Sequence, residues 1–129
     1  MPIQYARDDG TQMVIVTLNG ELPSVHDIRE VFHRHRAENV WHYGTLYDLR
    51  SMTGRPSFNY LRDLIANAAS FVPGGRTRGP VALLASEPAL HEIAAAFVEF
   101  ERAKSKIQVF REIAPAKAWL RKETGGSTA

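Results

Sequence analysis

The chain alternates regularly between short β-prone runs and longer segments with helical spacing, and this alternation limits the folds open to it. Four β-prone runs follow one another, at 12–20, 42–49, 81–86 and 107–110. After each of them comes a segment whose apolar residues recur at helical spacing, at 24–39, 57–70, 88–100 and 115–122. Alternation of this kind predicts an α/β fold with a mostly parallel sheet, four helices and right-handed crossovers.

A further strand is expected near the N-terminus. The run 2–6 is β-prone, and the stretch RDDGT (7–11) separates it from the next strand. An Asp-Gly pair between two β-prone runs is a strong hairpin signal, because both residues tolerate the backbone of a tight turn. We therefore expect an antiparallel hairpin to open a sheet of about five strands, whose order the pattern leaves open.

Length and composition narrow the class of protein. A chain of 129 residues suits one domain with one core, which we expect to span 1–122, with a disordered tail at 123–129. The formal charge is only +2, with 16 basic and 14 acidic residues intermixed, so no nucleic-acid role is expected. There is no cysteine, which excludes disulfides, thiolate catalysis and Cys-based zinc sites.

The N-terminal stretch indicates the cellular compartment, and the histidines and serines indicate whether metal binding or catalysis is expected. The stretch MPIQYARDDG lacks the apolar core of a signal peptide, and no apolar run approaches the ~20 residues that span a bilayer, so we expect a cytoplasmic protein. The histidines show no metal-binding spacing with a carboxylate partner, so neither a metal site nor a cofactor is predicted. No serine lies in a nucleophile elbow, which favours a protein that acts by binding and not by catalysis.

The loops that leave parallel strands gather at one edge of the sheet, where ligands bind in open α/β folds. Helix starts at Ser24, Ser57 and Ser86 are expected at this edge, and the cap of the third of these helices is either Ser86 or Glu87. Asp48 and Arg50 form either a ligand-binding pair or an ion pair at a strand end. Ser57 is either a functional serine or a helix N-cap. The candidate surface for a ligand or partner comprises Asp48, Arg50, Ser51, Thr53, Arg55, Ser86 and Glu87.

Three segments carry a resemblance to a known family: LYDLRSMTGRPSF (46–58), GPVALLASEPALHEIAAAF (79–97) and IQVFREIAPAKAWL (107–120). Together with the order of elements, they resemble the SpoIIAA-like branch of the STAS family, over roughly residues 10 to 122. Lipid-carrier domains of the Sec14 type are a weaker match. STAS domains include the anti-sigma-factor antagonists of bacteria. The resemblance therefore implies a bacterial regulatory protein whose partner is a signalling kinase or an anti-sigma-type factor.

The resemblance also implies a regulatory serine, at the start of the helix that follows the strand ending in YDL (47–49). Antagonists of this family carry it in an Asp-Ser-Ser-Gly-like motif, and its phosphorylation switches binding to an anti-sigma kinase. Counting forward from YDL leads to Ser57, although the residues here are RPSF (55–58). Ser57 is therefore the candidate phospho-acceptor.

Two functions follow from these observations. The first is a non-catalytic STAS-like interaction module, which docks a protein partner through the segment 48–60. The second is a domain that binds a small anion or a lipid at the carboxyl end of the sheet, where helix starts and arginines gather. A homodimer is compatible with either function, because an open sheet leaves edge strands that need protection.

Overall fold

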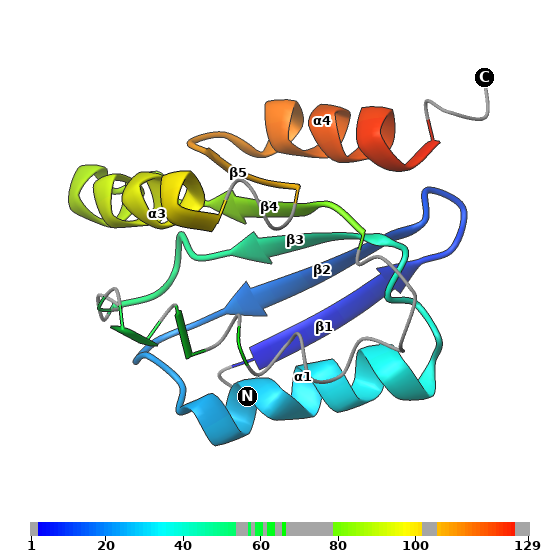
Figure 1. Cartoon of the computed structure of the whole chain (residues 1–129), viewed down its shortest axis with the longest axis horizontal. Helices are drawn as coiled ribbons and strands as arrows, with labels where there is room; N and C mark the ends of the chain where they lie inside the picture. Colours follow the sequence, from blue (N-terminus) through cyan, green and yellow to red (C-terminus); the bar gives the residue numbers. More distant parts are fainter. Residues whose placement is uncertain are drawn as a thin grey trace.

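A computed structural model describes residues 3–53, 57, 59–60, 62–63, 66, 79–101 and 106–125. Its five-stranded sheet follows the order of the chain: β1 (Ile3–Asp8), β2 (Met13–Leu18), β3 (Gly44–Asp48), β4 (Val81–Leu84) and β5 (Ile107–Phe110). The helices with assigned bounds are α1 (Val25–Ala37), α3 (Pro88–Glu101) and α4 (Ile113–Gly125) (Figure 1). The expected α/β architecture is confirmed, and the strand order that the pattern left open is sequential.

The pairing of the strands also agrees with the expectation. β1 and β2 are antiparallel, with Ile3 opposite Leu18 and Asp8 opposite Met13, and the other neighbouring strands are parallel. In the hairpin turn the Asp8 carboxylate accepts hydrogen bonds from the backbone N–H groups of Gly10 and Thr11, at 3.0 and 3.3 Å. The side chain of an Asp thus stabilises the turn, as is usual for this residue.

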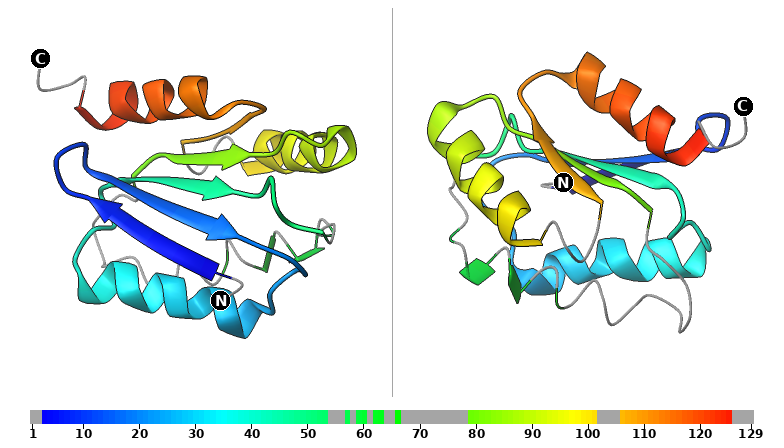
Figure 2. Two further views of the ribbon diagram at one scale, coloured as in Figure 1. Left: turned by 180° about the vertical axis from the view of Figure 1, so that it is seen from behind. Right: turned by 45° about the horizontal axis from the view of Figure 1, so that its top comes forward.

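Both faces of the sheet are covered, but by different helices. Because side chains alternate across a strand, Val14 and Val16 of β2 pack with Ile28 and Phe32 of α1. On the same face, Val81 and Leu83 pack with Ala94 and Val98 of α3. On the other face, Leu46, Ala82 and Leu84 pack with Ala116 and Leu120 of α4, so that α1 and α3 lie opposite α4 (Figure 2).

The helix α4 covers only part of its face. It lies against β3, β4 and β5, so β4 is buried over its whole length. A continuous apolar run such as Val81–Leu84 is typical of a strand covered on both sides. At the start of β2, Met13 is buried in the α4 cluster, but farther from α4 the cover is incomplete: Ile15 and Thr17 of β2 are partly exposed on this face, and Gln4 and Ala6 of β1 are exposed.

The helix α4 differs in extent from its sequence-based expectation. α4 begins at Ile113 and continues to Gly125, so the first three residues of the expected tail, 123–125, are helical. Thr124 explains the extension, because its hydroxyl donates to the Leu120 carbonyl at 2.7 Å and its methyl group lies close to Gly44 of β3. Residues 126–129 lie outside the described residues.

The second helix expected at 57–70 is described only at separate positions. The helical ones are Asn59, Tyr60, Arg62, Asp63 and Ala66, and Ser57 precedes them; the other residues of this segment lie outside the described residues.

One histidine of the segment FHRHR (32–36) belongs to the core. His33 is exposed, whereas His35 is fully buried between α1 and the sheet. Its ring stacks on Trp41, and its Nδ1 lies 2.9 Å from the Val31 carbonyl. Because a carbonyl only accepts, Nδ1 carries a proton, while Nε2 lies 3.3 Å from the Thr45 hydroxyl. Both ring nitrogens thus have partners, which is how a polar side chain is accommodated in a core.

Candidate functional site

The candidate residues lie where the parallel strands end. Since β2, β3, β4 and β5 run in the same direction, the segments that leave them emerge at one edge of the sheet (Figure 1). Asp48 is the last residue of β3, and Leu49 to Thr53 follow it; Ser86 and Glu87 follow β4, and Arg111 follows β5. Arg55 lies outside the described residues. We refer to this edge, with the helix starts beside it, as the carboxyl edge.

The backbone of the carboxyl edge is tied together after β2 and β3. The N–H of Gly20 donates to the Ser51 carbonyl at 3.1 Å, and the N–H of Thr53 donates to the Gly20 carbonyl at 2.7 Å. Gly20 has a φ of 79°, a left-handed conformation that glycine adopts without steric cost. Ser51 and Thr53 are both exposed, but their backbone is fixed by these hydrogen bonds.

Asp48 and Arg50 form an ion pair with each other. Nε and one terminal nitrogen of Arg50 lie 3.0 and 2.9 Å from the two carboxylate oxygens of Asp48, and the Arg50 backbone N–H also donates to this carboxylate. Burial acts to raise the pKa of Asp48, but these hydrogen bonds outweigh it and hold that pKa below its ordinary value. The charge of Arg50 is thus matched locally, which weakens the case for an anion site at this arginine.

Ser57 begins the second helix, as expected. Its side chain is exposed, and its hydroxyl oxygen accepts a hydrogen bond from the N–H of Tyr60 at 3.1 Å. A serine three residues before the amide that it accepts from is an N-cap. The cap leaves the hydroxyl at the surface, beside the positive end of the helix dipole, where a negative charge is favoured.

Tyr60 is a residue of the carboxyl edge that the sequence pattern did not single out. Its ring packs against the apolar cluster between β4, β5 and α3, and its hydroxyl donates to the carbonyl of Pro23, directly before α1. Burial, and next the carboxylate of Asp27, raise the pKa of Tyr60 to about 12. The start of the second helix is therefore attached to the start of α1. Pro23 is 37 positions away in the sequence, so no local motif signals this contact.

The start of α3 is capped by Glu87 and not by Ser86. The Glu87 carboxylate accepts from the N–H of Leu90 at 3.3 Å, and both Ser86 and Glu87 are exposed. Burial, and next the charge of Arg111, lower the pKa of His91 in the first turn of α3. The end of β5 thus lies close to the start of α3, and the carboxyl edge continues across all parallel strands.

The described residues contain no group of three His, Cys, Asp or Glu side chains arranged to hold a metal ion. Within the same residues, no helix is both long and apolar enough to cross a bilayer.

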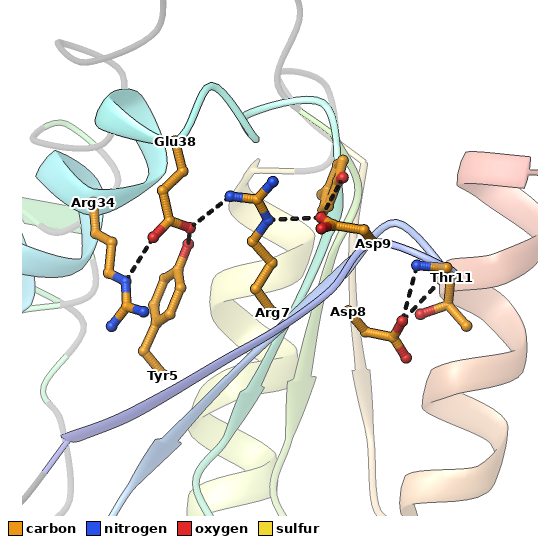
Figure 3. A network of polar contacts seen from close by, with 9 residues as sticks. Tyr5, Arg7, Asp8, Asp9, Thr11, Arg34 and Glu38 are labelled. Carbon is orange, nitrogen blue, oxygen red and sulfur yellow. Dashed lines mark hydrogen bonds and ion pairs between the residues drawn. The ribbon is translucent and has the colours of Figure 1, made fainter.

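A second polar cluster lies at the opposite end of the sheet (Figure 3). Glu38, at the end of α1, accepts hydrogen bonds from the Tyr5 hydroxyl at 3.1 Å, Arg7 at 3.2 Å and Arg34 at 2.9 Å. Arg7 also bonds Asp9 at 2.6 Å, so this cluster connects β1, the hairpin turn and α1. The cluster is matched in charge, and we interpret it as a clamp that holds the edge strand β1 against α1.

The clamp predicts a specific pH dependence of stability. Hydrogen bonds from Arg34, Arg7 and Tyr5 hold the pKa of Glu38 below its ordinary value of 4.5. The bond from Arg34 has the largest effect, and burial acts in the opposite direction. A lowered pKa stabilises the fold at pH values above 4.5, and the contribution is lost as the pH falls through the folded pKa. We expect Glu38→Gln to lower the urea midpoint at neutral pH and to flatten its decline in acid.

Urea titrations of the wild type and Glu38→Gln between about pH 3 and 7 measure this difference. Glu112→Gln changes an exposed carboxylate at the other end of the sheet and is the matched control. Equal acid slopes for the wild type and Glu38→Gln contradict the proposed role of the clamp.

Comparison with known proteins identifies the fold. The chain is similar to an uncharacterised protein of the DUF3478 family with a SpoIIAA-like fold from Shewanella loihica PV-4, at 15% identity and a TM-score of 0.62, over 92% of this chain and 91% of that one. It is also similar to an anti-sigma factor antagonist from Mycobacterium paratuberculosis, at 14% identity and a TM-score of 0.61, over 92% and 94% of the two chains. No protein-family model and no curated protein matches the sequence. The chain has a STAS fold of the SpoIIAA-like type.

Proposed function

We propose that this protein is a non-catalytic interaction module of the STAS type, which docks a regulatory protein through the carboxyl edge around Asp48 to Tyr60. The proposed partner is a signalling kinase or an anti-sigma-type factor, and the proposed switch is phosphorylation of Ser57. One of the similar structures is an anti-sigma factor antagonist, which supports a protein partner for this fold.

The observation that carries the proposal is the position of Ser57. Its hydroxyl is exposed at a helix N-terminus that follows β3, the place where the family resemblance implies the regulatory serine. A kinase would transfer the γ-phosphoryl group of a nucleoside triphosphate to the Ser57 oxygen, releasing the nucleoside diphosphate and the hydroxyl proton. A phosphate there would meet the N–H of Tyr60, which already donates to the Ser57 oxygen, and the positive end of a helix dipole, so the helix start tolerates the modified side chain.

The chemistry of the carboxyl edge supports docking over catalysis. Asp48 is paired with Arg50, and Glu87 caps α3, so these two acidic side chains already have structural partners. The Ser57 hydroxyl is engaged by a backbone amide, a contact that caps a helix and does not activate a nucleophile. A binding surface requires only exposed groups on a rigid backbone, which the Gly20–Ser51–Thr53 hydrogen bonds supply.

We expect a charge at Ser57 to change partner binding by about tenfold, which corresponds to ~1.4 kcal/mol. The test compares immobilised Ser57→Asp with Ser57→Asn as baits in a lysate of the source cell, with quantification of each retained protein. Both residues are good N-caps, so the helix start is preserved and the two baits differ in charge alone.

Ser86→Asp adds the same charge at another exposed serine of the carboxyl edge and is the control for position. A partner that distinguishes Ser57→Asp from Ser57→Asn but binds Ser86→Asp like the wild type supports the proposal. Identical retained proteins, in identical amounts, on all of these baits rule out a charge switch at Ser57. A native mass spectrum of the protein from its own cell reports whether it carries a phosphate, and fragmentation of the peptide that contains Ser57 assigns the position.

A further inference from the structure

Tyr60 connects two helix N-termini that are far apart in the sequence. Its backbone N–H is held by the cap residue of its own helix, Ser57, at 3.1 Å. Its hydroxyl is held by the carbonyl of Pro23, the residue before Ser24, and Ser24 caps α1 by accepting from the N–H of Asp27 at 3.1 Å. A continuous path of hydrogen bonds and covalent backbone therefore leads from Ser57 to the first turn of α1.

The ring between these two hydrogen bonds is well anchored. Tyr60 packs against the cluster formed by Val81, Leu83, Ala94, Val98 and Ile107. A phenol ring held on its apolar sides has little freedom to rotate, so a shift of its backbone is passed on to its hydroxyl. The position of the Tyr60 hydroxyl therefore follows the position of the Tyr60 backbone.

We infer that Tyr60 is a positioning residue that couples the two helix starts, so that the docking surface includes the first turn of α1 and responds there to a charge at Ser57. The inference rests on the proposed function for its biological role. It adds to that function a second contact region, Ser24 to Asp27, and a residue through which the region is linked to Ser57.

The electrostatics of the contact agree with this coupling. The carboxylate of Asp27 is one cause of the raised pKa of Tyr60, so it lies within electrostatic reach of the phenol oxygen. The N–H of Tyr60 already donates to the Ser57 oxygen, and a phosphate on Ser57 would attract this N–H more strongly than the hydroxyl does. The displaced ring would then carry its hydroxyl away from the Pro23 carbonyl and loosen the cap of α1.

The coupling can be measured in the isolated protein by amide resonances in ¹⁵N-labelled samples. We expect Ser57→Asp, compared with Ser57→Asn, to shift the resonances of Ser24 to Ile28, and we expect that shift to be lost in the Tyr60→Phe background. A salt concentration of about 0.15 M screens direct charge effects beyond roughly 8 Å. Ser86→Asp is the control and leaves the α1 resonances in place.

The variant Tyr60→Phe keeps the packed ring and removes only the hydroxyl. Unchanged resonances of α4 verify that this variant is folded. A shift in α1 that persists in Tyr60→Phe, or no shift in the wild-type background, overturns the inference. As a second test, we expect Asp27→Asn to lower the pKa of Tyr60 in an absorbance titration, and an unchanged pKa contradicts the proximity of the phenol to the first turn of α1.

The two proposals fail in different ways. If the α1 resonances shift as expected but no partner distinguishes Ser57→Asp from Ser57→Asn, the inference holds and the proposed function is wrong. If partners distinguish Ser57→Asp from Ser57→Asn equally well in the Tyr60→Phe background, the proposed function holds and the proposed role of Tyr60 is wrong.

Discussion

Gly79→Ala is expected to destabilise the protein by about 3 kcal/mol, which lowers the midpoint of thermal unfolding by roughly 10 °C. A Cβ atom at Gly79 would lie 2.3 Å from the Tyr43 carbonyl oxygen and 2.5 Å from that of His42. Both are backbone atoms, so the chain itself has to move. The Gly79 N–H donates to the Trp41 carbonyl at 2.8 Å, and this hydrogen bond keeps the two segments in close contact.

Gly10→Ala is the matched control for this prediction. The nearest atom to a Cβ at Gly10 is a carboxylate oxygen of the exposed Asp8 side chain, at 3.3 Å, which has to move by only a few tenths of an ångström. We expect a change below about 1 kcal/mol at this exposed turn. Equal losses for Gly79→Ala and Gly10→Ala in thermal or urea unfolding contradict the close backbone approach at Gly79.

Leu120→Ala is expected to lower the free energy of unfolding by about 3–4 kcal/mol. Leu120 is fully buried and packs with Leu46, Ala82 and Leu84 under α4, the one described helix on that face. Removal of three side-chain carbons leaves a cavity between a single helix and the sheet, and the loss grows with the volume that remains unfilled.

The measurement is a urea titration of the purified variant, with Arg121→Ala as the control on the same helix. Arg121 is exposed, so its truncation should change the free energy of unfolding by no more than about 0.5 kcal/mol. If Leu120→Ala is no more destabilising than Arg121→Ala, then α4 is not packed on the sheet as described.

The sequence was sufficient to predict elements whose signals are local. The Asp-Gly turn marks the hairpin, Ser24 marks the start of α1, and the run Val81–Leu84 marks a strand buried on both faces. The strand order was not accessible, because pairing between strands depends on contacts that periodicity does not report. The end of α4 was missed because Thr124 is held partly by Gly44, far away in the sequence.

In the candidate site, too, contacts between neighbouring residues could be predicted from the sequence, whereas contacts between distant residues could not. Because Arg50 is only two residues from Asp48, the sequence was sufficient to propose an ion pair between them. The structure supports this alternative. Tyr60 could not be selected, since its hydroxyl bonds Pro23 and its ring packs on strands that follow later in the chain. The Glu38 clamp was missed for the same reason, because Tyr5 and Arg7 lie 33 and 31 positions from Glu38.

The sequential strand order has a consequence for folding during synthesis. Each strand pairs with the one made just before it, so the sheet can grow from the N-terminus without waiting for distant segments. The helix α4 is made after all five strands, yet it covers β3 and β4 as well as β5. Until Ile113–Gly125 leaves the ribosome, Leu46 and Leu84 face water on a paired but open sheet, a state that invites aggregation or chaperone binding.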